Sequence, residues 1–293
     1  MSDIIQLLPD SVANQIAAGE VVERPAAVVK ELIENSIDAG STKIHVTIRN
    51  GGQSLIQICD NGMGISKEDL PLALERYATS KLLDDNLFAI RSFGFRGEAL
   101  AAIGAVSRLT IMSRTHHKEE TWQVNVEGGN SSEIAPAYLV SAGTTVHVKD
   151  LFYATPARLK FLRSPSTESQ HIQDIIKRIA LAHPLIEFVL KDDSKTILSL
   201  LPSTLSDHQE QFCERAEQIL GQDFRQNSCF VNHDQDGIQS WGMIGIPTYN
   251  RANGNQQYLY INNRPVKDKV LSSVLRIAYQ DYLSRDRFPV AIL

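Results

Sequence analysis

An α+β fold in two domains is predicted by three features of the sequence. Residues 25–40 begin with proline and end with glycine, the usual order at the two ends of a helix. Residues 43–60 contain two alternating apolar segments joined by Asn-Gly-Gly, which is typical of an antiparallel hairpin. Residues 201–207 contain Pro, Ser and Thr and are typical of a linker. We therefore expect a first domain over 1–204 and a smaller second α/β domain over 205–293.

Composition places the chain among ordinary globular proteins rather than membrane or secreted ones. Of its 293 residues, 43% are hydrophobic and 22% are charged. No apolar run approaches the ~20 residues needed to cross a bilayer, and the N-terminus lacks the pattern of a signal peptide. The three cysteines, Cys59, Cys213 and Cys229, are far apart and odd in number. This usage argues against a disulfide framework or a zinc site and predicts a reduced, cytoplasmic protein.

Periodicity and turn residues predict the remaining elements of the first domain. Residues 11–18 are expected to form a short helix that ends at Gly19. The spacing of Ser66 and Asp69 resembles a capping box, so a helix is expected to follow to about Tyr77. Residues 79–97 have no clear assignment. Further elements are expected as helices over 98–103 and 166–182 and as strands over 107–114, 121–127, 144–150, 187–190 and 196–200.

The second domain is also predicted to contain both helices and strands. An apolar segment begins at Phe288 and is typical of a strand. Because the chain stops inside this segment, at Leu293, we expect it to be a fragment whose second domain is incomplete. The other predicted elements are helices over 209–220 and 267–283 and strands over 228–233, 239–246 and 257–262.

The helix over 25–39 carries a stripe of acidic and amide side chains opposite an apolar face. At about 100° per residue, Asn35 lies about 40° from Glu31, and Asp38 about 20° on the other side. If a cleft faces this stripe, the neutral oxygen of Asn35 can ligate Mg²⁺. Glu31, one turn earlier, can accept a proton from an attacking water, a contribution of about 10²–10⁴ in rate. Taken alone, the pattern also suits an amphipathic surface helix with a solvated acidic face.

The phosphate-binding loop of many nucleotide enzymes is missing from the sequence. No Gly-x4-Gly-Lys-Ser/Thr pattern occurs. The substitute candidate is Gly94-Phe-Arg-Gly97, whose glycines expose backbone N–H groups just before a predicted helix. Such a short pattern also occurs in plain loops.

Asp60 follows Ile56 and Ile58 with the same parity, so its side chain is expected on the covered face of the sheet. A carboxylate there needs a partner, and an exocyclic amine such as that of adenine can donate to it. Gly62 and Gly64 would leave room for a flat base. The alternative is a type I′ turn at Asn61-Gly62, although the residues that follow do not continue as a strand.

The order of these motifs resembles the N-terminal part of the MutL family of DNA mismatch-repair ATPases. The superfamily of this family also holds gyrase B subunits, histidine kinases and heat-shock chaperone ATPases. The resemblance covers essentially the whole chain and is strongest over 13–114 and 143–183. Its superfamily motifs are 31–40, 60–64, 94–100 and 143–145, and its longer MutL-like strings are 13–25, 78–81, 94–100 and 151–162.

The resemblance implies a fold, two cofactors and a set of site residues. The fold is a mixed sheet covered on one face by helices (a Bergerat-type ATP-binding fold), followed by a smaller transducer domain. The cofactors are ATP and Mg²⁺. Glu31 is implied as the general base and Asn35 as the magnesium ligand, while Asp60 would read the adenine amine with Thr145 nearby. The other implied nucleotide contacts are Asp38, Gly64, Thr79, Ser80, Lys81, Gly94, Phe95, Arg96, Gly97, Glu98, Ala99 and Leu100, of which 79–81 and 94–100 belong to a lid that orders around the phosphates.

The resemblance also implies partners. These are DNA bound without sequence specificity, the mismatch-recognition protein MutS, a downstream nuclease or helicase, and a second copy of the chain upon ATP binding. Arg264 matches a family position associated with DNA. The net charge is −5, but basic residues outnumber acidic ones over 151–183 and 249–293, where Arg158 and Lys160 are further candidates for DNA contacts. Their alternative role is to cap or solvate a helix.

One family feature lies beyond this sequence. Family members carry a lysine within an Asn-Val-His-Pro-x-Lys stretch that reaches the terminal phosphate, and this chain stops before that stretch. We therefore expect weak binding or slow turnover, since a cation at the transferred phosphoryl group stabilises the transition state.

Two other functions remain open at this point. A phosphotransfer kinase of the same fold would need a phosphoacceptor histidine, and the eight histidines are scattered. A non-catalytic DNA-binding scaffold would keep every activity when Glu31 is replaced by alanine, whereas an ATPase would lose hydrolysis.

Overall fold

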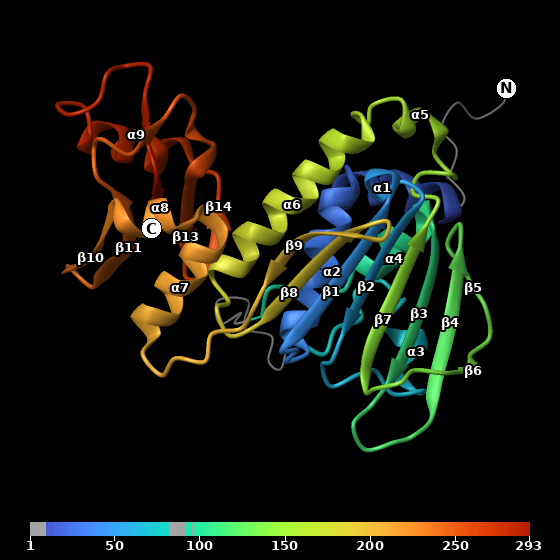
Figure 1. Ribbon diagram of the computed structural model, residues 1–293. Coiled ribbons are helices and arrows are strands. Elements are labelled where there is room, and N and C mark those ends of the chain that lie inside the picture. Colours follow the sequence, from blue (N-terminus) through green and yellow to red (C-terminus); the bar gives the residue numbers. More distant parts are fainter. Residues whose placement is uncertain (1–9, 82–91, 95) are drawn as a thin grey trace, which may run out of the picture. The chain divides into compact units, whose positions relative to one another are not determined.

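The computed structural model describes residues 10–81, 92–94 and 96–293 (Figure 1). They form two compact units. The first contains the described residues up to Ile176 together with Ile186–Ser199, and the second contains Lys177–Leu185 and Leu200–Leu293. The predicted α+β class is confirmed, because a large mixed sheet and helices make up the first unit.

The sheet of the first unit runs in the order β5-β4-β3-β7-β2-β1-β8-β9, and β6 pairs with β4. Strand β1 pairs parallel with β8 and antiparallel with β2, so the sheet is mixed. The Asn50–Gly52 turn joins β1 to β2 as predicted, and its residues have positive φ angles. The strands are β1 (Lys43–Arg49), β2 (Leu55–Asp60), β3 (Arg108–Arg114), β4 (Thr121–Glu127), β5 (Asn130–Ser131), β6 (Ala135–Ala137), β7 (Gly143–Lys149), β8 (Glu187–Asp192) and β9 (Lys195–Leu200).

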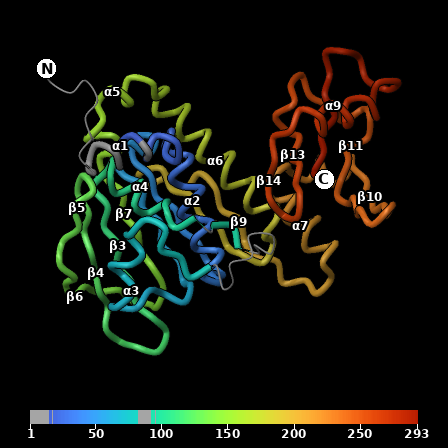
Figure 2. The backbone as a smooth tube through the Cα atoms, turned by 180° about the vertical axis from the view of Figure 1, so that it is seen from behind, coloured from blue at the N-terminus to red at the C-terminus, as the bar shows by residue number. Residues whose placement is uncertain are grey.

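Helices lie together on one face of this sheet (Figures 1 and 2). Helix α2 packs on β2, α4 packs on β3 and β4, and α1 packs on α4. The helices therefore cover one face of the sheet, as predicted. The helices whose residues begin in the first unit are α1 (Asp10–Val21), α2 (Pro25–Asp38), α3 (Asp69–Leu72), α4 (Ala99–Val106), α5 (Pro156–Leu159) and α6 (Pro165–Leu181).

The alternating pattern of β1 and β2 supplies the core beneath α2. Ile44, Val46 and Ile48 are buried, and Ile56 and Ile58 on β2 share their face. Burying each such side chain contributes about 1.5–3 kcal/mol. The buried side chains of α2 that pack over this layer are Val28, Val29, Leu32 and Ile33. Helix α2 is therefore fixed by its apolar face, which leaves the predicted acidic and amide stripe on the other side.

Several helices end at different residues from those predicted. The helix predicted over 267–283 ends at Ala278, and the one predicted over 98–103 continues to Val106. Helix α1 continues past Gly19 to Val21, so this glycine does not end the helix. A Cβ at Gly19 would lie 1.9 Å from the Arg158 guanidinium. Helix α3 ends at Leu72, well before the predicted end, and Tyr77 has a φ of +64° that no helix accommodates.

The second unit contains a five-stranded sheet in the order β10-β11-β16-β13-β14 and a separate pair, β12 with β15. The predicted strands over 228–233, 239–246 and 257–262 are present as β10, β11 and β13. The strand predicted from Phe288 is present as two short strands, β15 and β16. The other short strands, β12 and β14, have too few residues to show a period and were not predicted. The helices are α7 (His208–Leu220), α8 (Gln222–Gln226) and α9 (Lys269–Ala278), and the strands are β10 (Ser228–Gln235), β11 (Ile238–Gly245), β12 (Asn250–Arg251), β13 (Gln257–Ile261), β14 (Arg264–Val266), β15 (Phe288–Pro289) and β16 (Ala291–Ile292).

The contacts divide the chain differently from the predicted boundary after residue 204. They assign Lys177–Leu185 and residues 200–204 to the second unit, whereas the sequence placed both segments in the first. Leu181, at the end of α6, packs in the second unit's core with Phe212 and Phe224. Linker-like composition does not reveal such contacts. Within the described residues, every helix is too short or too polar to cross a membrane.

Candidate functional site

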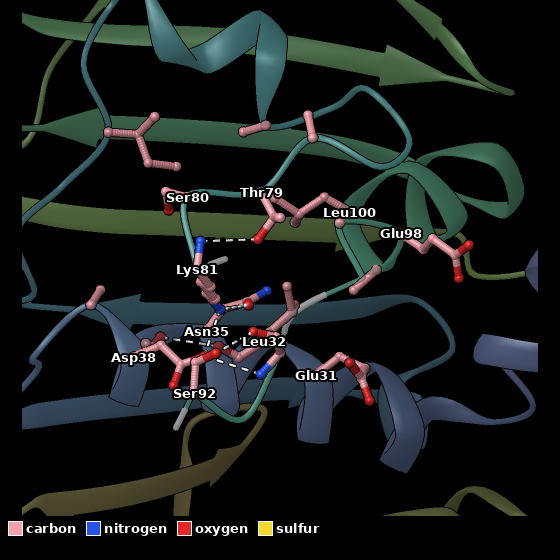
Figure 3. A pocket seen from close by; sticks show the side chains of 18 of the residues that line it. Glu31, Leu32, Asn35, Asp38, Thr79, Ser80, Lys81, Ser92, Glu98 and Leu100 are labelled. Carbon is pink, nitrogen blue, oxygen red and sulfur yellow. Dashed lines mark hydrogen bonds and ion pairs between the residues drawn. The ribbon is translucent and has the colours of Figure 1, made fainter. Parts of the chain in front are cut away.

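A cavity of about 1680 Å³ lies beside α2 in the first unit (Figure 3). Its walls come from segments that are far apart in the sequence. Glu31, Asn35 and Asp38 all line it, so the stripe predicted on α2 does face a cavity. The other lining residues at predicted site positions are Asp60, Gly64, Thr79, Ser80, Lys81, Gly94, Arg96, Gly97, Glu98, Ala99 and Leu100. Phe95 lies outside the described residues.

Lys81 joins the loop after Tyr77 to the polar stripe of α2. Its Nζ donates to Asn35 Oδ1 at 2.8 Å and to Asp38 Oδ2 at 2.6 Å. Asp38 also accepts hydrogen bonds from the backbone N–H groups of Phe93 at 3.0 Å and Gly94 at 3.2 Å. The Asp38 side chain is only 8% exposed, so these charge-assisted bonds compensate for its burial.

The oxygen atoms around Lys81 also suit a metal ion. Asn35 supplies a neutral oxygen and Asp38 an anionic one, and both converge on a single cationic group, the Lys81 ammonium. Mg²⁺ prefers oxygen ligands of these two kinds and keeps several waters and phosphate oxygens. The donor set therefore fits the predicted magnesium ion, with Asn35 as its protein ligand.

Local hydrogen bonds and close packing hold the two loop segments that contain Lys81 and Gly97. Thr79 Oγ1 accepts a hydrogen bond from Lys81 N at 3.1 Å. Tyr77 N donates to Gly97 O at 3.0 Å. A Cβ at Gly97, whose φ is +62°, would lie 2.3 Å from the Ala78 carbonyl oxygen, so only glycine fits there.

Helix α4 begins at the cavity. Glu98, Ala99 and Leu100 line the cavity, and α4 starts at Ala99. The first N–H groups of a helix have no acceptor within it and carry the positive end of its dipole. This end of α4 therefore offers donors to an anionic group such as a phosphate.

Asp60 lies at the end of β2 with three hydrogen-bond donors around it. Its Oδ2 accepts from the Ser36 hydroxyl at 2.8 Å, and its Oδ1 accepts from Gly62 N at 2.9 Å and Thr144 N at 3.3 Å. Ser36 is 4% exposed, so this contact is sheltered from water. The donors fix the carboxylate plane. Oδ1 uses both of its lone pairs on the two backbone N–H groups, so Oδ2 keeps the lone pair that a further donor can use.

The structure corrects the prediction for Thr145. In the β2–β7 ladder, Asp60 lies opposite Thr144, and Cys59 lies opposite Thr145. Directly opposite residues share a face, so Thr145 points away from the Asp60 side of the sheet. Thr144 lines the cavity instead. The apolar Val146 has the same parity as Thr144, and this signal in the sequence could have identified the right threonine.

The glycines after Asp60 have a different role from the predicted one. A Cβ at Gly64, where φ is +75°, would lie 2.3 Å from the Arg114 carbonyl oxygen. A Cβ at Gly62 would lie 2.7 Å from Ser41 Oγ. Both glycines are required by the protein's own close packing, and Gly64 also lines the cavity.

Glu31 contacts a neighbouring ion pair on α2. Lys30 Nζ donates to Glu31 Oε1 at 3.1 Å and to Glu34 Oε2 at 2.8 Å. Burial raises the pKa of Glu34, although its hydrogen bond to Lys30 acts in the opposite direction. Burial alone would lower the pKa of Lys30, but its contacts with both glutamates outweigh that effect and raise it.

The candidate DNA contacts have different surroundings. Arg158 Nη2 donates to the backbone oxygens of Gln15 at 3.3 Å and Ile16 at 3.5 Å, so this residue holds α1 rather than presenting a charge to solvent. Arg158 is half-buried, and its contact with DNA stays a prediction. Lys160 is exposed and Arg264 is half-buried at the start of β14, and for these two DNA contact stays a prediction.

Two segments of the chain match known protein families. Residues 23–147 match the family described as histidine kinase-, DNA gyrase B- and HSP90-like ATPase. Residues 216–293 match the family described as DNA mismatch repair protein, C-terminal domain. The fold and the first match define the class of protein: an ATPase domain of the gyrase B, histidine kinase and heat-shock chaperone type.

Similar proteins narrow this class to one family. A solved structure described as the Aquifex aeolicus MutL ATPase domain complexed with ADP is 30% identical, with 93% of each chain covered and a TM-score of 0.69. DNA mismatch repair protein MutL of Paramagnetospirillum magneticum is 49% identical over 99% of this chain and 47% of that protein. MutL of Rickettsia bellii is 47% identical over the same shares. The chain belongs to the MutL family of DNA mismatch-repair proteins, and it spans about half the length of these curated relatives.

Proposed function

We propose that this chain binds ATP with Mg²⁺ in the cavity beside α2 and hydrolyses it slowly. The observation that carries the proposal is the convergence of Glu31, Asn35 and Asp38 with Lys81 and the start of α4 on one cavity. A base, a metal ligand and an anion-binding helix end are the parts that phosphoryl transfer to water requires. The ADP complex of a related ATPase domain supports the same use of the cavity.

Asp60 reads the base of the nucleotide in this proposal. An exocyclic amine donates to the carboxylate that Ser36, Gly62 and Thr144 orient. A base without an amine at that place displaces water from Asp60 Oδ2 without replacing its hydrogen bond, so it binds less tightly. Adenine is therefore selected by one hydrogen bond.

At the other end of the cavity, α4 and Asn35 act on the phosphates. The first N–H groups of α4 bind phosphate oxygens, and Asn35 holds the metal through Oδ1. Mg²⁺, when bound, neutralises negative charge on the phosphate oxygens. Glu31 accepts the proton of the attacking water as general base.

Nucleotide binding tests this site directly. An ATP analogue is titrated with Mg²⁺ into the wild-type chain, Asp60→Ala and Asn35→Ala. We expect Asp60→Ala to weaken binding with and without metal, and Asn35→Ala to weaken it only when Mg²⁺ is present. Unchanged affinity in both variants would place the nucleotide elsewhere.

The functions of the whole protein extend this proposal. ATP orders the lid and closes two copies of this region into a dimer, which couples mismatch recognition by MutS in the cytoplasm to a downstream nuclease or helicase. DNA binds through phosphate contacts that include Arg264 and Lys160, without sequence specificity. Membership of the mismatch-repair family supports these roles. The molar mass of the chain in solution, with and without an ATP analogue, tests dimerisation, and a constant monomer mass contradicts it.

A further inference from the structure

We propose that Lys30, anchored by Glu34, is a positioning residue that restrains Glu31 and limits the rate of hydrolysis. The inference rests on the proposed function, because it concerns the base of that reaction. All three residues lie on α2, and only Glu31 lines the cavity. Lys30 acts through Glu31 and needs no contact with the nucleotide.

Glu34 keeps Lys30 at this place. Its side chain is 8% exposed, and a carboxylate so buried is costly without a cationic partner. Lys30 Nζ lies 2.8 Å from Glu34 Oε2 and is that partner. The lysine is therefore held beside α2 rather than moving freely in solvent.

The held ammonium then engages the base. Lys30 Nζ lies 3.1 Å from Glu31 Oε1, and the Glu31 side chain is 29% exposed. An oxygen that accepts a hydrogen bond from an ammonium is a weaker proton acceptor for water. Figure 3 shows the Glu31 side chain apart from the cluster of Asn35, Asp38 and Lys81. Lys30 therefore holds one Glu31 oxygen away from that cluster.

The two glutamates share one ammonium, and this sharing predicts effects of opposite sign. Removing the ammonium frees Glu31 and raises kcat. Glu34→Gln keeps a neutral oxygen that accepts a hydrogen bond from Lys30 and holds it in place, while Glu31 becomes the only carboxylate on Lys30. The contact with Glu31 then strengthens and kcat falls. A pair that merely stabilises α2, as such i,i+4 pairs do, would make both changes act in the same direction through stability.

The test measures kcat and KM for ATP with saturating Mg²⁺, and ADP affinity by calorimetry, on the chain of 293 residues. We expect Lys30→Met to raise kcat roughly two- to fivefold, the range of an exposed ion pair, with KM and ADP affinity unchanged. Glu34→Gln lowers kcat by a similar factor. Lys30→Arg returns kcat toward the wild-type value because it keeps the charge.

Two further variants keep the test decisive. The first is Lys30→Met combined with Glu34→Gln. This double variant lacks the unpaired buried carboxylate that Lys30→Met alone leaves, so we expect it to fold even if Lys30→Met does not. Its kcat is expected to exceed that of the wild type. Lys43→Met is the matched control, since Lys43 lies 4.0 Å from Glu187 on the sheet and is not among the described residues that line the cavity. We expect it to leave kcat unchanged.

Glu31→Gln separates the two proposals. If Glu31→Gln hydrolyses ATP like the wild type, Glu31 is not the base and both proposals fall. A different outcome overturns only the role of Lys30. In that case Glu31→Gln is inactive, but Lys30→Met and Glu34→Gln either shift kcat in the same direction or change KM instead.

Discussion

Lys81 Nζ lies 2.6 Å from Asp38 Oδ2, and this ion pair joins residues that are 43 positions apart in the sequence. The side chains of the pair are 22% and 8% exposed. The same ammonium donates to Asn35 Oδ1, the proposed magnesium ligand. One cation thus contacts both the amide and the nearest carboxylate of the polar stripe on α2.

Replacing Lys81 should therefore destabilise the first unit. Lys81→Met leaves a nearly buried carboxylate at Asp38, which we expect to lower the free energy of unfolding by about 1–3 kcal/mol. Asp38→Asn combined with Lys81→Met should cost less than the sum of the single changes, because the unpaired charge is gone. Denaturant unfolding of the four chains gives the coupling energy. Strict additivity would show that the pair contributes nothing.

The Asp60 network predicts a role for Ser36 in nucleotide affinity. Ser36→Ala removes the hydroxyl that donates to Asp60 Oδ2, so the carboxylate is less well oriented toward the base. We expect the Kd for ADP to rise about five- to tenfold, the effect of one hydrogen bond of about 1 kcal/mol or slightly more. Ser107→Ala is the control, since Ser107 is equally buried and donates to Ile103 O outside the cavity. Equal effects of the two changes would argue for general loosening.

Thr144 and Thr145 point to opposite faces of the sheet, because side chains alternate along a strand. Thr144→Val should weaken ADP binding because Thr144 lines the cavity, whereas Thr145→Val should leave it unchanged because Thr145 faces the other side of the sheet. Valine keeps the shape of threonine and removes only the hydroxyl. Calorimetric titration of both variants is sufficient, and a larger loss for Thr145→Val would contradict the register of β2 and β7.

The site could be predicted from the sequence only where a local period controls the geometry. Glu31, Asn35 and Asp38 share one face because a helix rotates each residue by a constant angle, and Asp60 shares the face of Ile58 because a strand alternates. Lys81 could not be paired with Asp38 in this way, since no period connects a loop to a distant helix. The choice of Thr145 came from matching a motif, and counting the parity of β7 would have corrected it.

The fold, like the site, could be predicted only where a local period controls the geometry. The long strands and helices were predicted because they contain enough residues to show a period. Helix α3 ends at Leu72, and the positive φ at Tyr77 excludes the predicted continuation to that residue; the sequence signals neither feature. Gly19 was taken as a helix end, but a side chain more than a hundred residues away packs on it. Contacts of this kind exist only after the chain has folded.

His147 should make stability depend on pH. Burial, and then the charge of Lys149, lower the pKa of His147 below its usual value of 6.5. The unfolded chain then binds the proton more readily than the folded chain. The stabilising contribution is present above about pH 6.5 and is lost as the pH falls through the lower folded-state pKa. Unfolding at pH 7.5 and 5.5 should show a smaller pH effect in His147→Gln than in the wild type, and an identical slope would exclude this residue.

Arg215 holds together the segments that the second unit takes from either side of the β8–β9 hairpin. It is 1% exposed, and its Nη2 donates to the backbone oxygens of Pro184 and Leu201, each at 3.0 Å. Burial lowers its pKa to about 10, so it stays charged at neutral pH.

Arg215→Met would leave both carbonyl oxygens without this donor, and we expect a loss of about 2–3 kcal/mol in the free energy of unfolding of the second unit. Arg215→Lys should recover little of it, because an ammonium on a flexible stem does not reproduce the planar donor. Arg225→Met is the matched control, since Arg225 forms an exposed pair with Glu210 at 2.9 Å and should cost less than about 1 kcal/mol. Thermal unfolding of the three variants and the wild type measures these differences. If Arg225→Met loses as much stability as Arg215→Met, burial of the guanidinium is not the cause of the effect.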